Sequence, residues 1–190
     1  MLISELIGRA SVQAGDAAQV KFSPWQLLNA YNDANKIMRK VLLDSFPRLL
    51  EKTETIATTS GNPIALEKKA LRITDVRIDG GKIYPLDITL VADISAVGKP
   101  NNYYMVDMST MAFYPLPNGE YSARVVYIPT FTEVDDTQDS GYPSEIESLL
   151  IGYMASVVQG ADTGADTWSV TVGELMGSID GDVVTIGGYY

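Results

Sequence analysis

The spacing of apolar residues changes twice along this 190-residue chain, from a helical repeat to a strand-like repeat and back. Apolar side chains recur every three or four residues near the N-terminus and again after residue 144. Between about residues 50 and 130 they alternate, and short β-branched runs are separated by turn residues. Helical and strand segments that are segregated in this way predict an α+β fold.

Two helices are predicted before residue 50. Leucines and isoleucines at helical spacing place the first over residues 2–13. The second is predicted over residues 24–44, with Ser23 as N-cap, a proline at the first helical position and Gln26 completing a capping box. Phe46-Pro47 ends it, because the residue before a proline disfavours the helical conformation.

The middle of the chain is predicted to be an antiparallel sheet or small sandwich of about six short strands. Asp79-Gly80-Gly81 indicates a hairpin turn, and a slip in the alternation near Thr74-Asp75 indicates a β-bulge. Four basic residues in this part alternate with apolar ones, which is more typical of solvent-facing charges on a sheet than of a nucleic-acid site. They are Lys68, Lys69, Arg72 and Arg77.

A third helix is predicted over residues 144–159, where apolar residues form a wide stripe that must be buried. Ser144 and Glu147 have the spacing of a capping box. We expect this helix to pack against helix 24–44 or against a neighbouring subunit.

These elements divide the chain into four predicted segments: 1–49, the N-terminal helices; 50–130, a β-rich insertion; 131–160, an acidic loop and the C-terminal helix; and 161–190, a C-terminal arm. The predicted fold is therefore a bundle of about three main helices with an inserted small antiparallel β domain and a C-terminal arm.

The absence of cysteine and histidine excludes several classes of chemistry. Disulfides, thiolate metal sites and cysteine or Ser-His-Asp catalysis cannot be built from this sequence. The acidic loop from Asp135 to Gly141 fails the EF-hand pattern, because Ser140 and Ile146 stand where glycine and glutamate are required. We therefore predict no enzymatic activity, no cofactor and no metal.

Charge is distributed unevenly around the net value of −10. Residues 1–82 hold 12 basic and 9 acidic side chains, whereas residues 83–190 hold 2 basic and 15 acidic ones. The asymmetry indicates either a solvated acidic surface or a surface that meets a basic partner or repels an acidic one. Tight binding to a nucleic-acid backbone is not expected, because it requires clustered Lys and Arg.

Four aromatic residues are candidates for partner binding: Trp25, Trp168, Tyr189 and Tyr190. Trp25, in the first turn of a helix, is either a core residue or an interface anchor. The terminal tyrosines follow Gly187-Gly188, so this segment is either a disordered end or a docking tail.

The N-terminal region resembles the opening of tailed-bacteriophage head-to-tail adaptor (connector) proteins. The stretch that carries the resemblance runs from Leu2, Leu6, Arg9 and Asp16 to Phe22-Ser23-Pro24-Trp25-Gln26-Leu27-Leu28 and Asn32-Asp33-Ala34. The later order is also similar: an aromatic strand into Tyr127-Ile128-Pro129, an acidic loop, a proline and an amphipathic helix.

The resemblance implies a structural virion protein, made in the host cytoplasm, that links the capsid portal to the tail. It implies a homo-oligomeric ring, usually twelvefold, that binds the portal protein and tail proteins. Double-stranded DNA passes through the channel of such a ring without sequence-specific binding. No apolar run is long enough to span a membrane, so no membrane is expected among the partners.

Three alternatives remain open at this point. One is a tail-tube or tail-completion protein, which is also a viral structural part. The others belong to different classes, a carboxylate-based hydrolase and a sugar-binding sandwich. A hydrolase requires a pocket with perturbed carboxylates, and a sugar binder requires aromatic side chains clustered in a groove.

Overall fold

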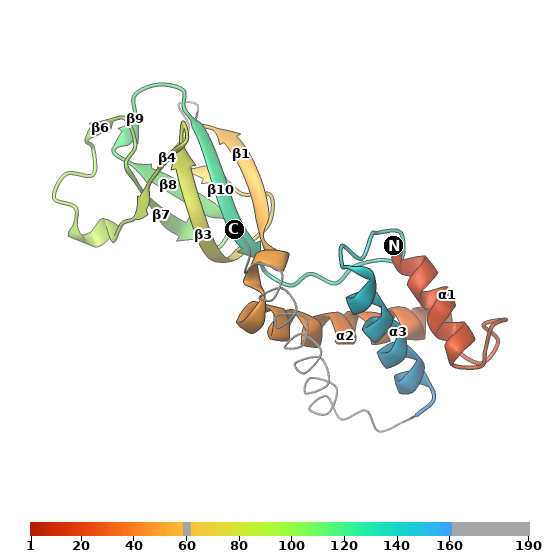
Figure 1. The fold of residues 1–190 in the computed structure, drawn as a ribbon. Helices are drawn as coiled ribbons and strands as arrows, with labels where there is room; N and C mark the ends of the chain where they lie inside the picture. The colour runs from red at the N-terminus through yellow and green to blue at the C-terminus, as the bar shows by residue number, and fades with distance from the viewer. Residues whose placement is uncertain (59–61, 161–190) are drawn as a thin grey trace, which may run out of the picture. The chain divides into compact units, whose positions relative to one another are not determined.

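A computed structural model describes residues 1–58 and 62–160 and has the predicted α+β composition (Figure 1). The chain divides into two compact units. A helical unit contains Met1–Phe46 and the described residues from Phe131 onward, and a β-rich unit contains Pro47–Thr130. The predicted C-terminal arm, 161–190, lies outside the described residues.

The helical unit is built from α1 (Ile3–Gln13), α2 (Pro24–Ser45) and α3 (Ser144–Val158). As expected, α3 packs against α2, and it also packs against α1. The apolar stripes of the three helices face inward, and their largest fully buried side chains are Ile3, Leu6, Leu27, Tyr31, Met38, Leu42 and Leu150. Burial of these side chains is the main stabilising contribution to the unit.

The N-terminus of α2 has the predicted capping box. The Ser23 hydroxyl accepts a hydrogen bond from the Gln26 backbone N–H, at 3.3 Å between the heavy atoms. The Gln26 side-chain oxygen in turn accepts one from the Ser23 backbone N–H at 2.8 Å. Two backbone donors that the helix itself cannot satisfy are thereby bonded.

The capping box predicted for α3 is wrong. Pro143 is the N-cap residue and Ser144 is already helical, so no side chain caps this end of the helix. The Glu147 carboxylate accepts hydrogen bonds from the Ser140 hydroxyl and from the N-terminal ammonium of Met1 instead. A charged donor makes a stronger bond to a carboxylate than a backbone N–H does, so the distant amine replaces the local cap.

The β-rich unit contains two four-stranded sheets and one additional strand pair. The first sheet has the order β1 (Lys52–Ala57), β10 (Ser122–Pro129), β3 (Ala70–Ile78) and β4 (Gly81–Lys82). The second has the order β2 (Ile64–Ala65), β8 (Thr110–Tyr114), β7 (Asn102–Asp107) and β5 (Tyr84–Pro85). The pair joins β6 (Val97–Gly98) to β9 (Leu116–Pro117), and two short 3-10 helices are η1 (Pro47–Leu50) and η2 (Ile88–Leu90).

The predicted irregularities of β3 are confirmed. The pairing of β3 with β10 shifts between Ile73 and Asp75, so Thr74 is the extra residue of a bulge. At the end of β3, Asp79 and Gly80 form the hairpin turn with positive φ angles of 48° and 82°. Positive φ at both central residues is the geometry of a tight turn that matches the twist of the flanking strands.

The two four-stranded sheets share one core. Val76, Ile78 and Val125 of the first sheet are buried in the same cluster as Met111 and Phe113 of the second. Two strand pairs in this unit, β5–β7 and β6–β9, are parallel, whereas only antiparallel pairing was predicted. Among the described residues, none of the helices combines the length and the apolar character that crossing a membrane requires.

Candidate interaction surfaces

Trp25 lies on the surface, at the start of α2. Its side chain is 69% exposed, so the prediction that it could be a core residue is wrong. Two further apolar residues are exposed nearby in sequence: Val12 in the last turn of α1 (62%) and Val20 in the α1–α2 loop (83%). We call Val12, Val20 and Trp25 the α1–α2 tip.

The loop between α1 and α2, which carries Val20 of the α1–α2 tip, is held in shape by the carboxylate of Asp16. Asp16 accepts backbone hydrogen bonds from Val20 at 3.0 Å and from Lys21 and Phe22 at 2.8 Å each. Burial raises the pKa of Asp16, but these backbone hydrogen bonds outweigh it and hold the pKa below the ordinary value. Val20 is therefore presented by an ordered loop, and Trp25 by the first turn of the helix that follows it, which lowers the entropic cost of binding a partner.

The acidic loop that precedes α3 accepts hydrogen bonds from backbone N–H groups at the start of α1. The backbone N–H groups of Ile3 and Ser4 donate to the carbonyl oxygens of Gln138 (2.9 Å) and Asp136 (3.0 Å). The first turn of a helix leaves such donors unsatisfied, so the loop caps α1 from a segment more than 130 residues away. These bonds give the loop a structural role at the start of α1.

Asn32 joins α2 to the segment that leads into the acidic loop. Its side chain donates to the Val134 carbonyl at 3.2 Å and accepts from the Val134 N–H at 3.0 Å. The neighbouring Asn35 accepts a hydrogen bond from the Tyr142 hydroxyl at 2.7 Å. Both asparagines are buried, so polar residues on the inner face of α2 are satisfied by the returning chain.

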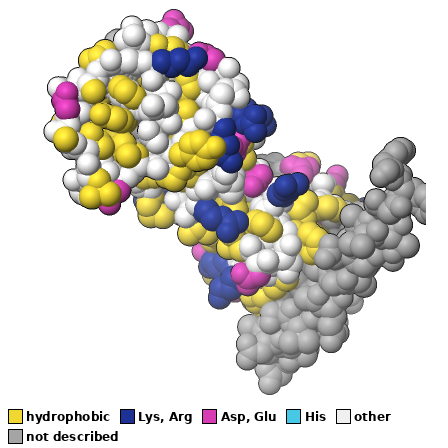
Figure 2. Space-filling model, turned by 60° about the vertical axis from the view of Figure 1, so that its left-hand side comes forward, with side chains coloured by type: hydrophobic (Ala, Val, Ile, Leu, Met, Phe, Trp, Pro, Cys, Tyr) yellow, Lys and Arg dark blue, Asp and Glu magenta, His cyan; other side chains and the backbone are white. Residues whose placement is uncertain are grey.

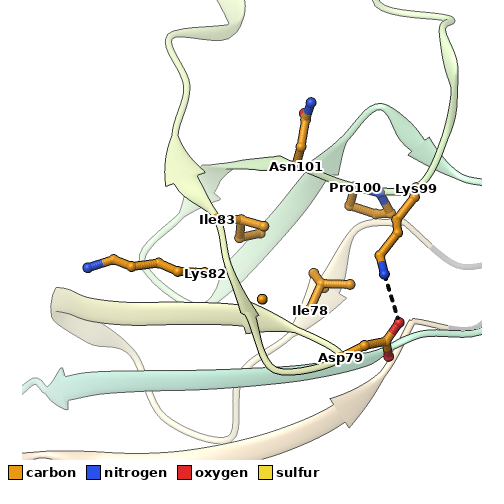
Figure 3. Close-up of a pocket in the computed structure, with 8 residues that line it drawn as sticks. Ile78, Asp79, Lys82, Ile83, Lys99, Pro100 and Asn101 are labelled. Carbon is orange, nitrogen blue, oxygen red and sulfur yellow. Dashed lines mark ion pairs between the residues drawn. The ribbon is translucent and has the colours of Figure 1, made fainter.

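The β-rich unit has a shallow pocket of about 370 Å³ near the β3–β4 hairpin (Figure 3). It is lined by Ile78, Asp79, Gly81, Lys82, Ile83, Lys99, Pro100 and Asn101. In Figure 3 the Lys99 ammonium points to the Asp79 carboxylate, and the two are 3.4 Å apart.

The pocket supports neither of the alternatives that require a pocket or a groove. It contains a single carboxylate, whereas glycoside hydrolysis generally uses two. No aromatic ring is among its lining residues, whereas a sugar-binding groove needs exposed rings.

The basic residues predicted on β3 and before it are exposed, as expected for solvent-facing charges. Arg77 forms an ion pair with Asp75 at 2.7 Å. Within the described part of the chain, Lys68, Lys69 and Arg72 form no ion pair. These three residues are therefore a local excess of positive charge on an acidic protein.

Of the four aromatic candidates, only Trp25 can be placed. Trp168, Tyr189 and Tyr190 lie outside the described residues. The structure gives roles to Asp16 and Asn32, which the sequence analysis named only as part of the family resemblance. A polar residue on the otherwise apolar face of α2 is the sequence signal that could have pointed to Asn32.

Comparison with known proteins gives one family. A family model described as SU10 adaptor protein matches residues 1–182, which is almost the whole chain. None of the curated proteins matches the chain.

Proposed function

We propose that this chain, which belongs to the SU10 adaptor protein family, forms a ring that links the capsid portal of a bacteriophage to the tail. Membership in this family makes the chain a phage adaptor protein and a component of the virion. The proposal adds a closed, twelvefold homo-oligomer, contacts with portal and tail proteins at its two faces, and a central channel for DNA. The protein has a structural rather than an enzymatic role.

The observation that carries the proposal is the exposure of large apolar side chains on both units. Trp25 and Val20 are exposed on the helical unit, and Leu90 (82%), Ile94 (65%) and Val97 (66%) are exposed on the β-rich unit. Each unit has its own buried core, so these side chains are not needed to complete the fold. Large apolar side chains that are exposed within short segments, as here, are candidates for protein–protein contacts.

The charge of the chain supports the channel part of the proposal. After Arg124 the sequence contains 11 acidic residues and neither Lys nor Arg. Acidic surface repels the phosphate backbone, so DNA would slide through an acidic channel instead of binding to its wall.

We assign partner binding to Trp25 and, from the sequence, to Trp168, Tyr189 and Tyr190. Tryptophan and tyrosine lose few rotamers on binding and bury a large area, which makes them frequent anchors at interfaces. In this assignment the α1–α2 tip inserts Trp25 into a portal or tail component.

The assignment is tested with Trp25→Ala, measured for binding to the portal protein of the same phage and for thermal unfolding of the free chain. We expect weaker portal binding and an unchanged melting temperature, because an exposed side chain contributes little to the monomer. Trp25→Phe, which keeps an aromatic anchor, is the matched variant and should retain most of the binding.

The results that oppose the assignment are also distinct. A melting temperature that falls in Trp25→Ala would make Trp25 a structural residue. Unchanged binding to both portal and tail components would remove Trp25 from the interface. Assembly into open, stacked tubes would favour the tail-tube alternative over the adaptor ring.

A further inference from the structure

The β-rich unit carries a long loop with an unusual surface. Residues 86–97, between β5 and β6, include three apolar side chains that are at least 65% exposed. We call residues 86–97 the projecting loop. In Figure 1 it extends from the left of the β-rich unit, where η2 and β6 lie.

The projecting loop is ordered by its own hydrogen bonds. Asp87 accepts from the Thr89 hydroxyl at 2.7 Å, and Asp93 accepts from the Ser95 hydroxyl at 2.6 Å. The Tyr114 hydroxyl donates to the Asp93 carbonyl at 3.1 Å, which ties the loop to β8. The exposed Leu90 and Ile94 are therefore held in a fixed arrangement, so that this surface is preorganised for binding.

A shallow groove of about 320 Å³ lies elsewhere on the same unit. Its lining residues come from the start of β3 and the end of β7: Ala70, Leu71, Arg72, Ile73, Met105, Asp107 and Met108. Leu71 and Met108 are about half exposed, at 52% and 49%. Figure 2 shows several patches of hydrophobic side chains on the visible face of the β-rich unit.

The charges around the loop and around the groove are complementary. The loop carries Asp87 and Asp93, and no Lys or Arg occurs between Lys82 and Lys99. Hydrogen bonds from Thr89 and Ser95 hold the pKa values of these two carboxyls below their ordinary range, so both are charged at neutral pH.

The residues in and next to the groove carry mainly positive charge. Arg72 lines it, and Lys68 and Lys69 come directly before its first residue, Ala70. Asp107 is the one carboxylate in its lining, and it accepts hydrogen bonds from Ser109.

The loop and the groove lie toward opposite ends of β7. The loop is tied near the beginning of this strand, because Tyr114, which holds Asp93, pairs with Asn102. The groove is formed at the end of the strand, by Met105 and Asp107. A contact between two different surfaces of identical chains is head-to-tail, and such contacts generate rings when the rotation closes.

From this geometry we propose that the projecting loop of one copy docks into the groove of a second copy, with Leu90 and Ile94 against Leu71 and Met108. The loop carboxylates then face Lys68, Lys69 and Arg72 of the second copy. This inference rests on the proposed ring and names the surfaces that join its subunits.

The direct test uses the absence of cysteine from the chain. Leu90→Cys and Met108→Cys are made in separate full-length chains, mixed, and oxidised under mild conditions. We expect disulfide-linked dimers that contain one chain of each kind, because a disulfide forms only between side chains that meet. Ser148→Cys mixed with Met108→Cys is the control, since Ser148 is exposed in the helical unit and lies outside the α1–α2 tip, and it should give no specific product.

A second test is Leu90→Arg, measured by native mass and by thermal unfolding. Leu90 is 82% exposed, so we expect an unchanged melting temperature and at least a tenfold loss of assembly. Ser148→Arg, at an exposed position of α3 outside the α1–α2 tip, should leave assembly unchanged.

Different results would overturn the proposed ring and the proposed loop-and-groove contact. Parental chain that forms rings, with no Leu90–Met108 cross-link and rings intact in Leu90→Arg, overturns the loop-and-groove contact and leaves the ring standing. Parental chain that stays monomeric overturns the ring, and this contact with it.

Discussion

At the scale of single residues, the helical unit depends on a few polar side chains that join distant parts of the chain. Glu147 binds the N-terminal ammonium at 2.9 Å, and Asn32 makes two hydrogen bonds to the backbone of Val134. Each contact spans more than 100 residues of sequence, so forming it closes a long loop at an entropic cost that the rest of the fold must offset.

Replacing Asn32 tests its link to Val134. In Asn32→Ala both backbone groups of Val134 lose their partner, and we expect a loss of about 2 kcal/mol in the free energy of unfolding. Asn29→Ala is the control, because Asn29 is exposed on the same helix and its replacement should change the free energy of unfolding little. Chemical denaturation measures both variants. Equal stability of the two variants would contradict the role given to Asn32.

The Glu147 contact predicts a pH dependence. The hydrogen bonds that the Met1 ammonium donates to Glu147 and then to Asp139 raise the pKa of the ammonium above its ordinary value of 8.0. Burial raises the pKa of Glu147, but the bonds from Ser140 and the ammonium outweigh it and leave the pKa below 4.5.

The two pKa shifts limit the stability of the fold at opposite ends of the pH range. The raised ammonium pKa stabilises the fold fully below pH 8.0, and this stability is lost as pH rises through the folded-state value. The lowered carboxyl pKa stabilises it above pH 4.5, and this is lost as pH falls. We expect melting temperatures to reach a plateau between these limits, and Glu147→Gln to lower the plateau. A Glu147→Gln profile that superimposes on the parental one would contradict this account.

At the scale of elements, the features predicted correctly are those that short stretches of sequence determine. The Ser23 capping box and the Asp79-Gly80 turn each involve residues within three positions of one another. The Thr74 bulge was visible as a local slip in the alternation.

The features predicted wrongly or missed depend on distant segments. The α3 cap was wrong because its glutamate binds an amine 146 residues away. The parallel pairs β5–β7 and β6–β9 join segments whose adjacency has no local signal. The exposure of Trp25 was undecided for the same reason, since a helical repeat does not reveal what covers the first turn.

The hairpin turn gives a prediction at this scale. Gly80 and Gly119 both have open space where a Cβ would be added, but only Gly80 has a positive φ, of 82°. Gly80→Ala should therefore cost about 1 kcal/mol through backbone strain, and Gly119→Ala close to nothing. Urea unfolding of the two variants measures the difference. A larger loss at Gly119 would show that the strain argument is wrong.

The buried apolar stripe of α3 gives a second prediction at this scale. Leu150 is fully buried between α3 and the other helices. Leu150→Asp places an unpaired charge in this core and should cost about 4 kcal/mol or prevent folding. Ser148→Asp, exposed on the same helix, should melt close to the parental temperature. Parental melting of Leu150→Asp would mean that the stripe is not a core.

At the scale of the whole molecule, the two folded units each leave large apolar side chains exposed. The helical unit presents the α1–α2 tip, and the β-rich unit presents the projecting loop and a groove of the same chain. Together with the family match over residues 1–182, these surfaces support the proposal that the chain works as part of an assembly.

The most direct test of this account is the native mass of the purified full chain across a range of concentrations. The account predicts one discrete, closed oligomer, with twelvefold stoichiometry and a central opening visible in electron micrographs of the same sample. A chain that remains monomeric at every concentration, or that forms oligomers of unlimited size, would contradict it.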